Sequence, residues 1–148
     1  MIFRNEYWFL SNMYPCDVEI IIQGKKMNFK CVESAYQAQK NPNEAYKFVN
    51  FDGFEAKKLG KTVPLSIDNW DTVGRIIAMK QCLESKFSNA TLKAKLIAIK
   101  EPIIESNVWG DTFWGISHNK GKNILGLMLE QLKVSNEINL DLILPLIK

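Results

Sequence analysis

Residues 18–40, with the sequence VEIIIQGKKMNFKCVESAYQAQK, determine the fold class that we expect. They begin with a run rich in β-branched residues, turn at Gly24-Lys25, and alternate apolar and polar residues over positions 27–31. This pattern is typical of a β-hairpin. Residues 33–40 are rich in Ala, Gln and Glu and predict a helix, which Asn41-Pro42 ends. A hairpin followed directly by a helix indicates an α+β protein.

Two short helices are predicted next in the chain. Asn43 is placed to cap a helix over residues 43–49. Asp52, with Glu55 three residues later, resembles a capping box, and Gly60 is a plausible end for the helix that this box begins.

Three longer segments complete the predicted secondary structure. A helix that begins at Asp68 or Asn69 has an apolar stripe at helical spacing, made of Val73, Ile76, Met79, Leu83 and Phe87. Asn89 begins a helix that Pro102 terminates, with Leu92, Leu96 and Ile99 facing inward. Residues 123–133 predict a last helix, with Ile124, Leu125, Met128, Leu129 and Leu132 apolar. Residues 103–115 are predicted as strand and loop, and the last dozen residues fit a helix or a strand. We therefore expect one compact, α-rich α+β domain with a small β-sheet over residues 1–148.

The amino-acid composition excludes some kinds of functional site. The chain has 148 residues, 47% of them hydrophobic and 24% charged, and a net charge of +3. It has one histidine, His118, which excludes sites built on two or more histidines. Of its 19 basic residues only Arg4 and Arg75 are arginine, and no clustered basic stripe typical of nucleic-acid binding is present.

Cysteine usage and hydropathy predict a cytoplasmic protein. Cys16, Cys31 and Cys82 are odd in number and form no CxxC pair, so reduced structural thiols are the simplest interpretation. The N-terminal ten residues lack the apolar core of a signal peptide, and no apolar run approaches the roughly 18 residues that span a bilayer. No membrane partner is expected.

One face of the predicted helix over residues 33–40 carries four polar groups. Glu33, Tyr36, Gln37 and Lys40 stand at positions i, i+3, i+4 and i+7. Such a stripe is most often a solvated face. It could instead line a site in which Glu33 handles protons or stabilises a cation, while a desolvated Lys40 acts as a nucleophile.

Other segments are open to two interpretations. Trp109-Gly110-Asp111 and Trp114-Gly115 could approach a flat ligand, or could simply close the core. Residues 118–123, a basic loop with glycine, could bind an anion at a helix start or form a solvated turn. The lysines near Lys58 could hold phosphate or mark an exposed helix end, and the residues around Phe9 and Asn12 could contact a base or pack in the core.

Taken together, these segments resemble the YbiA-like (NADAR) family in order and spacing over nearly the whole chain. The matching segments are Phe9-Leu-Ser-Asn12 with Tyr14-Pro15, Glu33-Ser-Ala-Tyr-Gln-Ala-Gln-Lys40, Ala56-Lys-Lys-Leu-Gly-Lys61, Trp70, Lys86-Phe87, Trp109-Gly-Asp-Thr-Phe-Trp-Gly115 and Gly121-Lys-Asn-Ile-Leu-Gly126. The resemblance implies a compact α+β fold with one polar site and N-glycosidase activity. It implies cleavage between ribose C1 and an exocyclic amine, in ADP-ribosylated guanine or in the phosphoribosylamino-pyrimidine intermediates of riboflavin synthesis.

The resemblance also implies a set of site residues. Glu33 and Lys40 match the reaction centre, and Asp111 offers a second carboxylate. The residues expected to bind substrate are Phe9, Asn12, Tyr36, Gln37, Lys58, Trp109, Gly110, Trp114, Gly115 and Asn123. No metal or other cofactor is expected, and modified bases within DNA or RNA are candidate substrates. The alternative from another class is a non-catalytic module that binds ADP-ribose or a nucleotide.

Overall fold

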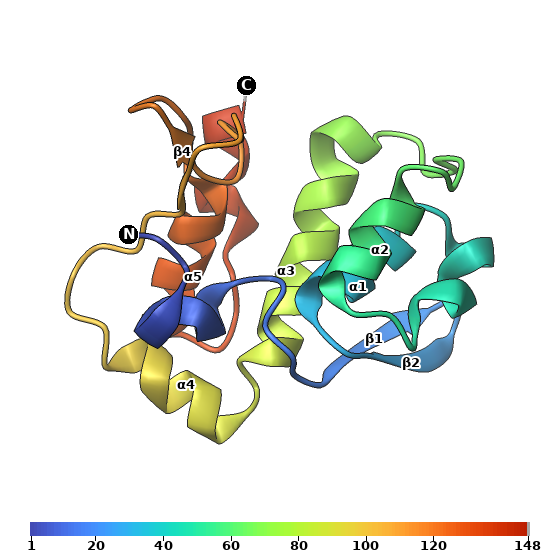
Figure 1. The fold of residues 1–148 in the computed structure, drawn as a ribbon, viewed down its shortest axis with the longest axis horizontal. Helices are drawn as coiled ribbons and strands as arrows, with labels where there is room; N and C mark the ends of the chain where they lie inside the picture. Colours follow the sequence, from blue (N-terminus) through green and yellow to red (C-terminus); the bar gives the residue numbers. More distant parts are fainter. Residues whose placement is uncertain (148) are drawn as a thin grey trace. The chain divides into compact units, whose positions relative to one another are not determined.

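The computed structural model describes residues 1–147. The chain forms two units, each described by itself below (Figure 1). One consists of Asn12–Lys86, and the other joins Met1–Ser11 to the chain from Phe87 onward. The expectation of a single domain over residues 1–148 stays a prediction.

The unit of residues 12–86 begins with the predicted hairpin. Strand β1 (Val18–Ile22) pairs antiparallel with β2 (Lys25–Phe29), so that Val18 faces Phe29 and Ile22 faces Lys25. Alternate residues of β1 are buried, as the pleat of a half-covered strand requires. The predicted hairpin is therefore confirmed, although its turn is at Gln23-Gly24, and Lys25 already belongs to β2.

The unit has three α-helices, α1 (Val32–Ala38), α2 (Gly53–Gly60) and α3 (Arg75–Lys86). Helices α1 and α3 pack on the hairpin and on each other, and α2 packs on α1 (Figure 1). The capping box that begins α2 is present in both directions, since the side chains of Asp52 and Glu55 each accept the other's backbone N–H. The predicted end of α2 at Gly60 is also confirmed.

The predicted cap at Asn43 is wrong. The segment Pro42–Phe48 is a 3₁₀ helix that begins after Asn41, because Pro42 suits a first helical position, where no N–H is needed. The side chain of Asn43 instead accepts a hydrogen bond from Gln23 at 2.9 Å.

The apolar stripe of the long helix is correct except at Val73. Ile76, Met79 and Leu83 are buried, whereas Val73 is 38% exposed. Residues Trp70–Gly74 form a π-helical turn before α3, and its wider winding rotates Val73 out of the stripe.

The other unit contains α4 (Ala90–Ile97), α5 (Ile124–Val134) and a 3₁₀ helix at Asn5–Leu10. Its two short strands, β3 (Ser106–Asn107) and β4 (Ile116–Ser117), are parallel. The N-terminus joins this unit because the amino group of Met1 donates to the backbone oxygen of Ile104 at 3.0 Å, and Ser106 N donates to Met1 O at 2.9 Å.

The predicted inward faces of both helices in this unit are confirmed. Asn89 caps α4 by accepting from Leu92 N at 3.0 Å, and the buried residues are Leu92, Leu96, Ile99, Ile124, Leu125, Met128, Leu129 and Leu132. The Lys93 ammonium links α4 to the end of α5 by donating to the backbone oxygens of Leu132 and Ser135.

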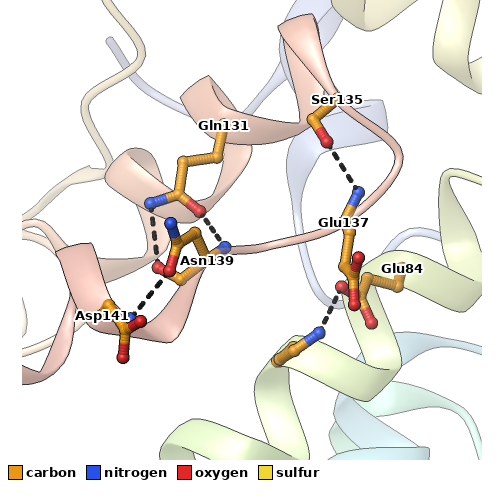
Figure 2. Close-up of polar contacts among 7 residues, drawn as sticks. Glu84, Gln131, Ser135, Glu137, Asn139 and Asp141 are labelled. Atoms are coloured by element: carbon orange, nitrogen blue, oxygen red, sulfur yellow. Dashed lines mark hydrogen bonds and ion pairs between the residues drawn. The ribbon is translucent and has the colours of Figure 1, made fainter.

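The C-terminal segment, whose structure the sequence leaves open, folds back on α5. Figure 2 shows the amide of Gln131 paired with the backbone of Asn139, while Asn139 Oδ1 accepts from Asp141 N at 2.9 Å. Two 3₁₀ helices follow, at Leu140–Leu142 and Leu144–Ile147.

The described residues are rich in helix and contain two small two-stranded sheets, which confirms the predicted α+β class. Among residues 1–147 we find no helix with the length and apolar character needed to cross a membrane.

Candidate functional site

The N-terminus of α1 holds Glu33 in a fixed place. The thiol of Cys31 caps the helix by accepting from Ser34 N at 3.5 Å. The backbone N–H of Glu33 donates to the backbone oxygen of Asn12 at 2.9 Å, which joins the start of this unit to the first turn of α1. Cys31 thus has the structural role that the sequence predicts.

Gln37 orients the Glu33 carboxylate. Its Nε2 donates to Glu33 Oε1 at 2.9 Å, across the i to i+4 spacing of one helix face. The other end of the Gln37 amide presses against Gly60 of α2, where an added Cβ would collide with Gln37 Oε1. Gly60 therefore allows the close approach of α2 that places Gln37 beside Glu33.

Glu33 and Lys40 both have shifted pKa values. Removal from water is the largest effect on Glu33 and raises its pKa, although the Gln37 hydrogen bond and the positive charges of Lys57 and Lys40 oppose it. Desolvation lowers the pKa of Lys40, while Glu33 and Asp71 act in the opposite direction. A carboxyl that keeps its proton longer and an amine that loses its proton sooner are suited to acid–base and nucleophilic chemistry.

Two buried acceptor atoms lie in the same part of the unit. Asn12 Oδ1 and Gln37 Oε1 have no hydrogen-bond partner among the described residues. The Asn12 amide nitrogen donates a hydrogen bond to Met79 Sδ at 3.8 Å. Because buried polar atoms are normally paired, these two oxygens are candidates to accept from hydroxyl or amino groups of a ligand.

An aromatic pair supports the middle of α1. The rings of Tyr36 and Trp70 lie 5.3 Å apart and tilted by 50°, and both side chains are buried. Trp70 occupies the first position of the π-helical turn. The next residue is Asp71, whose negative charge raises the pKa of Lys40. Tyr36 thus belongs to the predicted site but is already covered by Trp70.

Helix α2 presents Lys57 and Lys58 differently. Gly53, Ala56 and Gly60 form its buried stripe. Lys57 is three residues before Gly60 and shares that side, whereas Lys58 is two residues from both Ala56 and Gly60 and points to the opposite side. Lys57, one of the lysines near Lys58 that could hold phosphate, is the α2 lysine whose positive charge lowers the pKa of Glu33. Its three-residue spacing from Gly60 is the signal in the sequence that would have identified it.

The other unit contains the Trp-rich loop. Asp111 is held within this loop, because its Oδ1 accepts from the backbone N–H groups of Phe113 at 3.0 Å and Trp114 at 2.9 Å. The Asn107 side chain donates to Asp111 O and accepts from Asp111 N. Gly110, with φ of +86°, allows the turn. Asp111 therefore shapes the loop with at least one of its carboxylate oxygens.

The side-chain amide of Asn123 bridges two backbone segments. Asn123 Nδ2 donates to Ile103 O at 3.0 Å and Asn123 Oδ1 accepts from Glu105 N at 3.0 Å. Gly115 packs so closely on Glu105 that a Cβ there would collide with the Glu105 backbone oxygen. Asn123 and Gly115 thus have defined structural contacts, and their expected role in binding substrate stays a prediction.

The remaining predicted residues differ in exposure. Trp109 is 62% exposed, Trp114 is half-buried with its ring edge-on to Phe113, and Phe9 is buried under the Lys95 ammonium at 4.6 Å. A groove of about 340 Å³ in this unit is lined by residues 100–104, Asn123 and the α5 residues Leu127, Glu130 and Lys133. It shares only Asn123 with the predicted site.

The structure thus gathers the predicted residues in two groups. Asn12, Glu33, Tyr36, Gln37 and Lys40 come together around α1, with Lys58 on the outer side of α2. The second group, in the other unit, is Phe9, Trp109, Gly110, Asp111, Trp114, Gly115 and Asn123. The grouping around α1 carries the carboxylate, the amine and the unpartnered acceptors.

The protein has a helix-rich α+β fold in which α1 begins beside the Glu33 carboxyl and ends at Ala38, two residues before the Lys40 amine, so the helix ends earlier than the predicted range of residues 33–40. A family model described as the NADAR domain matches residues 2–135. The chain belongs to the NADAR family.

A similar sequence and a similar solved structure support this assignment. The sequence is that of N-glycosidase YbiA of Escherichia coli strain K12, which is 32% identical over 108 residues. That match covers 68% of this chain and 66% of the relative, slightly under two thirds of its length. The NMR structure of the E. coli protein YbiA is also similar, with a TM-score of 0.72 and 27% sequence identity, over 90% of this chain and 82% of that one.

Proposed function

We propose that this protein is an N-glycosidase that hydrolyses the bond between ribose C1 and an exocyclic amine. The observation that supports this most directly is a pair of oppositely shifted groups at the two ends of α1, Glu33 in its first turn with a raised pKa and Lys40, two residues after its end, with a lowered pKa. The name of the E. coli relative, an N-glycosidase, is consistent with the same chemistry.

In the mechanism that we favour, Lys40 is the nucleophile. As the bond between C1 and the ribose ring oxygen breaks, that oxygen takes a proton from water and becomes a hydroxyl, which leaves an iminium at C1. The neutral amine of Lys40 adds to this carbon. The exocyclic amine then leaves with a proton, which yields a Schiff base between Lys40 and C1. Water hydrolyses this Schiff base to the free sugar aldehyde and regenerates the lysine. The lowered pKa of Lys40 increases the fraction of amine that can react at neutral pH.

Glu33 supplies the proton in this scheme. Because desolvation raises the pKa of Glu33, the carboxyl keeps its proton to a higher pH than an exposed glutamate and can give it to the leaving amine, and its anion then stabilises positive charge at C1. Asp111 remains a candidate for a second carboxylate that stabilises this charge. Tyr36 and Trp114 are proposed to stack on the base or sugar.

The proposed substrates are ADP-ribosylated guanine, free or within DNA or RNA, and phosphoribosylamino-pyrimidines. The protein is proposed to act in the cytoplasm without a metal or other cofactor. The two unpartnered acceptors, Asn12 Oδ1 and Gln37 Oε1, suit ribose hydroxyls, which both substrate types carry.

The test uses the full chain with each substrate, one an ADP-ribosylated guanine oligonucleotide and the other the pyrimidine intermediate. We expect release of free ADP-ribose or ribose 5-phosphate, and a borohydride-trapped adduct at Lys40 detected by mass spectrometry. Lys40→Arg should lose the adduct and turnover. Turnover without any Lys40 adduct would overturn the nucleophile, and tight binding without turnover would identify a non-catalytic ADP-ribose or nucleotide-binding module.

A further inference from the structure

The side of α2 that faces α1 carries a lysine beside the proposed reaction centre. Gly60 contacts Gln37, and Gln37 donates to the Glu33 carboxylate at 2.9 Å. Lys57 lies one turn before Gly60 on this side of α2. A short chain of contacts therefore connects the position of Lys57 to Glu33.

Lys57 is available to a ligand. Its side chain is exposed and makes no hydrogen bond or ion pair with any residue of the described part of the chain. Its charge reaches Glu33 nonetheless, because it lowers the pKa of that carboxyl more strongly than Lys40 does. An unpaired ammonium close to a site for ribose C1 is suited to an anion that is part of the same ligand.

Resting on the proposed function, we infer that Lys57 binds the 5′-phosphate of the ribose whose C1 reacts at Glu33 and Lys40. In both proposed substrate types this phosphate is attached to the reacting ribose. Lys58 is the competing candidate on the same helix, but it points away from the buried stripe of Gly53, Ala56 and Gly60. Lys57 thus sets a preference for phosphorylated over phosphate-free ribosylamines.

The experiment compares Lys57→Gln with Lys58→Gln, which remove the same charge from the same helix, and uses Lys25→Gln on β2 as a distant charge control. Each variant is assayed with the phosphoribosylamino-pyrimidine and with its dephosphorylated form. Lys57→Gln should raise KM about tenfold for the phosphorylated substrate alone, in the range of a lost hydrogen bond to a charged group. We expect Lys25→Gln to match the wild type.

Three results would overturn the inference. They are an equal effect of Lys57→Gln on both substrates, a larger effect of Lys58→Gln, and equal effects of all three variants. Calorimetric titration with ribose 5-phosphate separates this inference from the proposed activity. If the wild type binds ribose 5-phosphate and Lys57→Gln weakens that binding, Lys57 is an anion site even when neither substrate is turned over. If ribose 5-phosphate binds equally to both, Lys57 is not that site.

Discussion

At the scale of single residues, Glu33 stabilises the fold more when protonated than when ionised. Its pKa in the folded protein is raised above that of the unfolded chain by desolvation. The unfolded chain therefore releases this proton first as pH rises, and the stability that Glu33 contributes at low pH is lost as pH rises through the folded pKa.

Glu33→Gln removes this titration while keeping the size of the side chain. We expect the variant to gain stability relative to the wild type as pH rises above the unfolded pKa of about 4, measured by denaturant unfolding, and to lose activity about a hundredfold or more. Glu55→Gln, on an exposed carboxyl of α2, serves as the control for a general charge effect. A stability difference that stays constant with pH would contradict the assigned pKa direction.

Gly60 and Gly126 are both glycines within helices, yet a methyl group added at each position should change the free energy of unfolding by different amounts. At Gly60 it meets the end of the flexible Gln37 side chain, whereas at Gly126 it meets the backbone oxygen of Ile103 and the Asn123 amide. Gly60→Ala should keep the free energy of unfolding within about 1 kcal/mol of the wild type, because the side chain can move and alanine favours the helix. Gly126→Ala should cost about 2 kcal/mol or more.

Gly60→Ala should nonetheless impair the site. Moving Gln37 removes a hydrogen bond that lowers the pKa of Glu33, so this pKa should rise further, as NMR titration would show, and turnover should fall about tenfold. In a Gln37→Ala background, Gly60→Ala should have no further effect on either quantity. Independent, additive effects of the two changes would contradict this coupling.

The polar face of α1 is the part of the site that the sequence predicts best. Helical spacing alone places Glu33, Gln37 and Lys40 on one side, and the structure adds the 2.9 Å hydrogen bond between the first two. The sequence offered Lys57 and Lys58 equally as lysines that could hold phosphate, and it did not rank them, because that choice depends on how α2 packs on α1.

At the scale of elements, two asparagines that look equally suited to begin helices behave differently. Asn89 accepts from Leu92 N at 3.0 Å and caps α4, while Asn43 lies inside a 3₁₀ helix and bonds to Gln23. Asn89→Ala should lower the free energy of unfolding by about 1 kcal/mol, and Asn43→Ala by at most about 0.5 kcal/mol. Equal losses in denaturant unfolding would contradict the assignment of the cap.

Helices and the hairpin were predictable because local signals agree with their packing. The capping box at Asp52 and Glu55 and the alternating strand β1 are examples. The π-helical turn was not predictable. It contains one residue more than an α-helical turn, and no residue type is typical of that extra position. The two-residue strands β3 and β4 are likewise too short to produce a periodic pattern.

At the scale of the whole molecule, the division into two units has no signal in the sequence. No Gly-rich or Ser-rich linker separates Ser11 from Asn12 or Lys86 from Phe87. Residues far apart in the chain form one unit because Met1 pairs with Ile104 and Ser106, a long-range contact that local patterns do not encode.

Lys86 gives the stability of the protein an alkaline dependence. It is fully buried, and desolvation lowers its pKa from 10.5 to about 8. The folded protein therefore releases this proton before the unfolded chain does, so stability should rise between about pH 8 and about pH 10, by up to about 3 kcal/mol.

Lys86→Met should abolish this rise, as denaturant unfolding across that pH range would show. Lys25→Met, at an exposed position of β2, should retain it. A wild-type stability that does not change across this pH range would contradict a buried ammonium at position 86. So would a rise in stability that both variants lose equally.

The π-helical turn at Trp70–Gly74 has a consequence for changes in chain length. Because it holds one residue more than an α-helical turn, a deletion of one residue after Trp70 should give ordinary α-helical winding there and leave the segments on its two sides in nearly the same relative orientation. Trp70 should then stay against Tyr36. A one-residue deletion inside α3 lacks this spare residue and would turn the preceding chain by about 100°, so the protein should accept the first deletion more readily than the second.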